Sequence, residues 1–147
     1  QNDLETAELA FAEFRSFNKG HSREADAAFW LGRVQFMRGQ YEKAAMTFSE
    51  FNSIYPGDAR LVDTTMWIAE SVSHFAPQEQ ACAIYASLPK LLDSPPDSFY
   101  TRLDTLSKAS IVAVDRKTNF DSNSVNETFG EALNRLLPTG TSPALIT

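Results

Sequence analysis

The side chains best suited to catalysis or metal binding are few and widely spaced. Histidine occurs only at His21 and His74, and neither has a second ligand four residues away, the spacing of a helical metal site. Both fall in an expected turn or near a helix end, which favours solvated histidine over a metal ligand. Cys82 is the single cysteine, so an internal disulfide and a thiolate metal cage are excluded. Because no histidine is adjacent to activate its thiol, we interpret Cys82 as a buried structural residue.

Motifs for catalysis or cofactor binding do not occur. The chain has no Gly-x-Ser-x-Gly elbow, no Walker phosphate loop and no dinucleotide-binding glycine pattern. Carboxylates are abundant, but several recur at a fixed spacing, as expected of solvated helix faces; these are Glu5, Glu13, Glu42 and Glu50. The sequence therefore predicts a protein without catalytic activity, cofactor or metal.

Composition narrows the class of partner. The formal net charge of −6 argues against a duplex nucleic-acid surface, which needs a basic face. No apolar run approaches the roughly eighteen residues that span a bilayer, so we expect no membrane insertion. At 147 residues and 43% hydrophobic, the chain is long enough to bury a core as one domain.

An internal repeat with a period of 37 residues organises the first part of the chain. Residues 3–30 align without a gap on residues 40–67. A third, weaker copy places Ala81, Tyr85 and Leu88 beneath Ala44, Phe48 and Phe51. Ten of the 28 pairs in the first alignment are identical, namely Glu5/Glu42, Ala7/Ala44, Phe11/Phe48, Glu13/Glu50, Phe14/Phe51, Ser16/Ser53, Gly20/Gly57, Arg23/Arg60, Asp26/Asp63 and Trp30/Trp67.

Each copy is predicted to be a pair of helices, which makes the fold all-α. Bulky residues recur at helical spacing over residues 23–37 and again over residues 41–54. Gly39 marks the first helix end through a left-handed turn, and Pro56-Gly57 marks the second. Asp58 is then the expected N-cap of a helix that runs to about Phe75.

Packing of the helix pair is predicted from small and large residues. Gly32 on the first helix is expected to face Ala44 on the second, because helices that cross closely need small side chains at the crossing. Phe48 and Phe51 would supply most of the burial. A single pair cannot cover its own apolar face, so successive copies are expected to stack.

These residues together resemble the tetratricopeptide repeat. The signature positions are Leu31-Gly32, Gly39, Tyr41, Ala44, Phe48 and Pro56. Gln35 and Ala28 depart from the usual tyrosine and tryptophan, and the period exceeds the family's common 34 residues by three. The resemblance implies a TPR-type α-solenoid of antiparallel helix pairs over residues 1–106. It also implies that the helix at the start of this sequence is the second helix of a repeat, so that the first repeat lacks its first helix.

The longer period and several strings are similar to one subfamily, the C-terminal domain of the YbgF/CpoB Tol–Pal-associated cell-division coordinators. The strings are Phe29-Trp30-Leu31-Gly32, residues 39–44, residues 55–58 and residues 81–83. This resemblance implies a periplasmic scaffold whose partners are a TolA-type protein and a peptidoglycan synthase. The family trimerises through a coiled coil, so the resemblance also allows a homo-oligomer.

Residues 107–147 are expected to close the solenoid. Asp97 can cap a helix through Phe99, Leu103 and Leu106, extending towards residue 114. A polar loop at 117–123 and a short amphipathic helix from Val125 to Leu137 would follow. That last helix, a Pro/Gly break and the apolar residues 144–146 are also similar to the entry into a tRNA(Ile)-lysidine synthetase, which implies a cytoplasmic accessory segment as an alternative.

A peptide-binding groove is predicted on the first helices of each pair. Aromatic and methionine anchors flanked by charges suit a bound peptide. The alternatives are that Phe29 and Met66 pack into neighbouring repeats, and that the Arg/Asp pairs at 23/26 and 60/63 are surface salt bridges. A generic peptide-binding repeat protein with unrelated partners also stays open. The candidate groove residues are Asp26, Phe29, Arg33, Met37, Asp63, Met66, Glu70 and His74.

Overall fold

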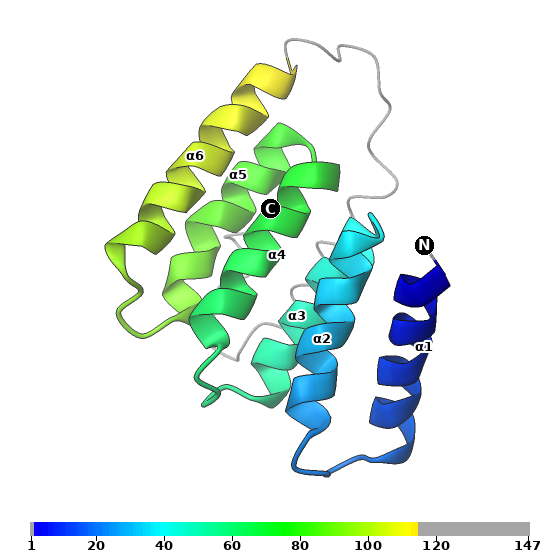
Figure 1. The fold of residues 1–147 in the computed structure, drawn as a ribbon. Helices are drawn as coiled ribbons and strands as arrows, with labels where there is room; N and C mark the ends of the chain where they lie inside the picture. The colour runs from blue at the N-terminus through cyan, green and yellow to red at the C-terminus, as the bar shows by residue number, and fades with distance from the viewer. Residues whose placement is uncertain (1, 115–147) are drawn as a thin grey trace.

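The computed structural model describes residues 2–114, with side-chain surroundings for residues 3–109. This part of the chain is all-helical, as predicted, and contains no strand. Figure 1 shows its elements in chain order, which are α1 (Asn2–Phe17), α2 (Glu24–Met37), α3 (Tyr41–Ile54), α4 (Leu61–Phe75), α5 (Gln78–Ser87), the 3-10 helix η1 (Leu88–Leu91) and α6 (Asp97–Val114).

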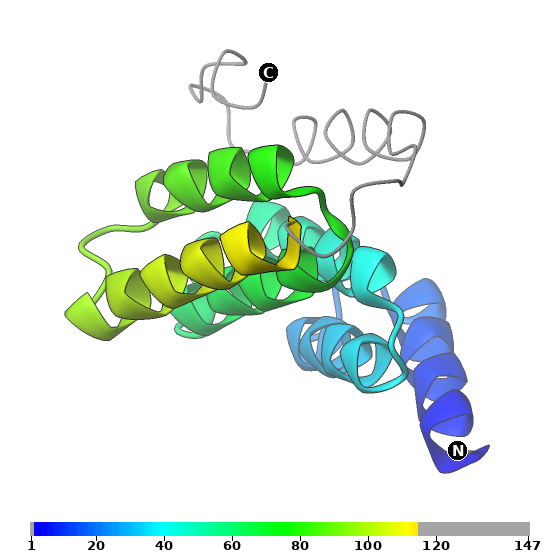
Figure 2. The ribbon, with the colours of Figure 1, turned by 90° about the horizontal axis from the view of Figure 1, so that it is seen from above.

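The helices follow one another across the molecule, each packed against its neighbours. Helix α1 lies at one edge, and α6 lies at the opposite edge (Figures 1 and 2). Helix α2 packs against α1 and α3, and α3 packs against α4. Helix α6 packs against both α4 and α5. The order of contacts therefore follows the order of the chain, as in an array of helical hairpins.

The helix ends confirm two sequence predictions and correct a third. Helix α3 spans the predicted Tyr41–Ile54, and Gly39 has the left-handed φ of 75° that ends α2. Asp58, however, is not the N-cap of α4, because that position belongs to Arg60. Asp58 lies two residues earlier, where its Oδ1 accepts a hydrogen bond from the Arg60 backbone N–H at 2.9 Å. It thus forms the turn before the helix rather than the cap.

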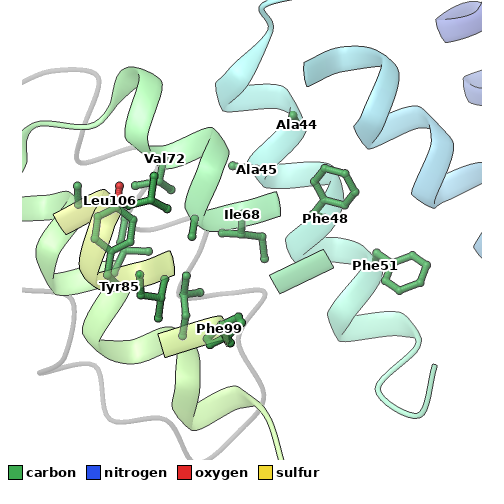
Figure 3. Close-up of a cluster of buried hydrophobic side chains, with 14 of the residues drawn as sticks. Ala44, Ala45, Phe48, Phe51, Ile68, Val72, Tyr85, Phe99 and Leu106 are labelled. Carbon is green, nitrogen blue, oxygen red and sulfur yellow. The ribbon is translucent and has the colours of Figure 1, made fainter. Parts of the chain in front are cut away.

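One buried apolar cluster runs from α2 to α6. Phe48 and Phe51 are fully buried, and Figure 3 shows them projecting from α3 away from Val72, Tyr85 and Leu106. Those three come from α4, α5 and α6 and belong to the same cluster, whereas the Phe48 and Phe51 rings pack against Phe29 of α2. The buried Ala81, Tyr85 and Leu88 agree with the third copy predicted from the repeat.

The close approach predicted at Gly32 is present, but its neighbour is the Phe48 ring. A methyl group on Gly32 would lie 2.7 to 2.9 Å from three ring carbons of Phe48. Glycine is therefore needed on α2 because an aromatic ring on α3 fills the space above it.

The C-terminal elements differ from expectation in two details. Helix α6 runs without interruption through the boundary expected at residue 106. Cys82 is only partly buried, and its Sγ lies 3.5 Å from the Ser107 Oγ. The loop predicted at 117–123 and the helix predicted at 125–137 lie outside the described residues.

Candidate functional site

The predicted groove residues lie on α2 and α4, and one of them belongs to the core. Phe29 is 7% exposed and packs edge-on against Phe48 and Phe51, with ring centroids 6.1 and 6.5 Å apart. Met66 is half-buried against the same cluster. For these two residues the alternative reading holds, because helical stacking buries the positions that were candidate anchors.

Two of the charged residues predicted for ligand binding, Arg33 and Glu70, make contacts within the molecule. The Arg33 guanidinium lies 4.1 Å from the centroid of the Trp67 ring, so it joins α2 to α4. Glu70 accepts two hydrogen bonds from Arg102 on α6, at 2.5 and 3.0 Å. The hydrogen bonds that Arg102 donates to Glu70 raise the pKa of the Arg102 guanidinium. Arg33 and Glu70 therefore hold neighbouring helices together.

Three of the predicted residues do face solvent. Met37 and Asp63 are exposed. His74 is exposed too, but its ring stacks on Tyr41 at a centroid distance of 3.9 Å and meets Phe36 edge-on at 5.6 Å. The predicted groove is thus reduced to scattered exposed side chains on two helices.

Of the two Arg/Asp pairs considered as surface salt bridges, 23/26 and 60/63, only the first forms. Arg23 pairs with Asp26 at 3.4 Å. Arg60 instead bridges Asp58 at 3.0 Å and Asp26 of the preceding copy at 2.9 Å. Hydrogen bonds from Arg60 lower the pKa of the Asp58 carboxyl and raise that of the guanidinium. This arginine therefore links two copies of the repeat.

An apolar groove between α1 and α2 was missed by the sequence analysis. Its volume is about 360 Å³, and Trp30 at its side is 47% exposed. Helix α1 is anchored on other faces by Arg15 to Glu50 at 3.2 Å and by Glu8 to Arg38. The groove is lined by Ala10, Phe11, Phe14, Arg23, Asp26, Ala27 and Trp30.

The 37-residue repeat explains what this groove is. Shifted by one period, its seven lining positions become Thr47, Phe48, Phe51, Arg60, Asp63, Thr64 and Trp67. Five of the seven residues are the same in both copies. In the second copy the aromatic members of this set lie against α2, whereas in the first copy they line an open groove. Aligning the sequence on itself identifies the two aromatic sets, but the structure is needed to show that α2 covers only the second set.

No protein-family model, curated protein or solved structure matches this chain.

Among the residues that the structure describes, no three His, Cys, Asp or Glu side chains are grouped to hold a metal ion. In that same part of the chain, no helix has the length and apolar character needed to cross a membrane.

Proposed function

We propose that this protein is a non-enzymatic protein-binding module and that the groove between α1 and α2 is its binding site. One observation carries the proposal. The aromatic set that is buried under a helix in the second copy of the repeat is repeated in the first copy and lies open there. Exposed apolar area of this kind is typical of an interaction site.

The groove has the chemistry of a protein interface. Three aromatic side chains line it, those of Phe11, Phe14 and Trp30. Aromatic side chains are enriched among the residues that contribute most to binding energy in protein interfaces. Arg23 and Asp26 stand among them and supply charges that fix orientation. An apolar groove with a few charged groups suits an amphipathic helix better than a polar or extended ligand.

The resemblance supports a more specific form of this proposal. The chain would be a TPR-type α-solenoid with a 37-residue period, acting as a periplasmic scaffold between the Tol–Pal system and septal peptidoglycan synthesis. Its partners would be a TolA-type protein and a peptidoglycan synthase. Of the eight residues first assigned to the groove, Asp26 lines the site that we now propose.

Binding to purified domains tests the proposal. The full chain is titrated calorimetrically with the periplasmic domain of a TolA-type protein and with that of a peptidoglycan synthase. Phe14→Glu should abolish binding, since it places a charge on the groove floor. Phe17→Glu is the matched control, because Phe17 lies on the same helix, is 83% exposed and does not line the groove. Equal binding by both variants would refute the site.

A further inference from the structure

We infer that the partner's binding element is an amphipathic α-helix with the contact pattern of α2, supplied by another protein. This inference rests on the proposed function of the groove as a protein-binding site. The internal repeat provides the template, because α2 occupies the equivalent position: it packs against α3, and its Phe36 and Arg33 contact Trp67 of α4. The contacts that α2 makes with α3 and α4 therefore define the contacts that a bound helix must make with α1 and α2.

The apolar part of the pattern comes from Phe29 and Gly32. The Phe29 ring packs edge-on against Phe48 and Phe51, whose counterparts in the open groove are Phe11 and Phe14. Gly32 lets α2 approach the Phe48 ring so closely that no Cβ fits between them. A partner helix therefore needs an aromatic residue and, three residues later, a glycine to sit over Phe11.

The charged part of the pattern comes from Asp26 and Arg33. Asp26 of α2 accepts a hydrogen bond from Arg60 at 2.9 Å, and the counterpart of Arg60 is Arg23, whose side chain is 75% exposed. Arg33 lies over Trp67, whose counterpart is the exposed Trp30. The partner helix should carry an acid three residues before its aromatic residue and an arginine directly after its glycine. The groove thus defines two charged positions on the partner helix, an acid opposite Arg23 and an arginine over Trp30.

One position should differ from α2. The Thr47 hydroxyl donates a 2.6 Å hydrogen bond to the Gln35 side chain of α2. The counterpart of Thr47 in the open groove is Ala10, which has no side-chain donor. A glutamine of the partner would lose that bond on burial, so the partner should carry an apolar residue there.

The experiment uses a synthetic peptide of residues 21–39 carrying Gln35→Leu, titrated calorimetrically into the full chain. We expect saturable binding that increases the helical circular dichroism of the mixture. The unsubstituted peptide should bind about tenfold more weakly, because its amide is buried without a partner. A peptide that also carries Gly32→Leu should not bind, since its side chain would collide with Phe11. On the protein side, Phe14→Glu should abolish binding and Phe17→Glu should leave it unchanged.

Several results would overturn the inference. They are absence of binding, equal binding by the Gly32→Leu peptide, and binding that Phe14→Glu leaves intact. A wild-type dimer in sedimentation that Phe14→Glu dissociates would show that a second copy occupies the groove, which also overturns it. If the peptide fails but Phe14→Glu still abolishes binding of the TolA-type domain, the helical pattern is wrong and the proposed function stands. If the peptide binds and neither domain does, the pattern is right and the assignment of those partners is wrong.

Discussion

Phe11 and Phe14 on α1 correspond to Phe48 and Phe51 on α3, yet the first pair is half-buried and the second pair is fully buried. The residue types are the same, so the difference comes from the neighbour. Helix α2 covers the α3 pair, and no described helix covers the α1 pair in the same way. In a repeat array, exposure of a side chain is therefore set by its place in the stack as much as by its chemistry.

The two grooves also differ in their polar contacts. The filled one is closed by polar contacts, from Thr47 to Gln35 at 2.6 Å and from Arg60 to Asp26 at 2.9 Å. In the open one, Ala10 replaces Thr47, and His21 replaces the Asp58 that pairs with Arg60. The open groove therefore keeps the counterpart of Arg60, at Arg23, but it has neither the threonine hydroxyl nor the second acidic partner of that arginine.

The largest expected effect separates the two aromatic sets directly. Phe48→Ala should lower the free energy of unfolding by about 3 to 5 kcal/mol, because it leaves a cavity in the core. Phe11→Ala at the equivalent position should cost about 1 kcal/mol or less, because that ring is already partly in water. Urea denaturation of the two variants measures the difference. Equal losses would mean that the first groove is as closed as the second.

The next effect tests the close approach that α2 makes in the filled groove. Gly32→Ala should lower the free energy of unfolding by about 1 to 2 kcal/mol, since the crowding of the Phe48 ring outweighs the better helix propensity of alanine. Gly57→Ala is the control, because nothing lies within 4 Å of its Cβ and φ is not left-handed. A stabilised Gly32→Ala variant would contradict the packing.

A smaller effect is expected from the cation over Trp67. A double-mutant cycle between Arg33→Ala and Trp67→Ala should give a coupling free energy of about 1 kcal/mol. The parallel cycle between Arg33→Ala and Trp30→Ala should give less, because that guanidinium-to-centroid distance is 6.0 Å. Reversed magnitudes would mean that Arg33 belongs to the open groove rather than to the filled one.

The smallest effect concerns how the Arg60–Asp58 pair changes the stability of the fold with pH. Hydrogen bonds from Arg60 lower the pKa of the Asp58 carboxyl below 3.8, so the folded state favours the carboxylate more than the unfolded chain does. This stabilisation, about 0.5 kcal/mol, is complete above the ordinary aspartate pKa and declines as pH falls through the lower folded value. Asp58→Asn should remove it at neutral pH, and the gap to wild type in thermal unfolding should narrow in acid. A gap that widens in acid would contradict this sign.

The helices could be predicted from the sequence because local signals coincide with the packing. The Gly39 turn and the apolar spacing over residues 41–54 give the boundaries of α2 and α3 within one residue. The candidate site could not be predicted in the same way. Phe29 and Arg33 have the residue types of a binding surface, but their burial and pairing depend on contacts with α3 and α4.

The repeat did contain the information needed for the open groove. Phe11, Phe14 and Trp30 match Phe48, Phe51 and Trp67 by sequence alone. What was missing was the position of α2 over the second set, which only the three-dimensional arrangement gives. Long-range helix stacking, rather than local propensity, decides which copy is covered.

The proposed site requires that the α1–α2 groove accepts a helix as the α3–α4 groove accepts α2. The most direct test follows the two indole N–H resonances of the isotope-labelled full chain by NMR during titration with the Gln35→Leu peptide of residues 21–39. Trp30 should shift and saturate together with backbone signals of Phe11 and Phe14, while Trp67 stays in place. Shifts centred on Trp67, or no shift at Trp30, would contradict binding at the α1–α2 groove.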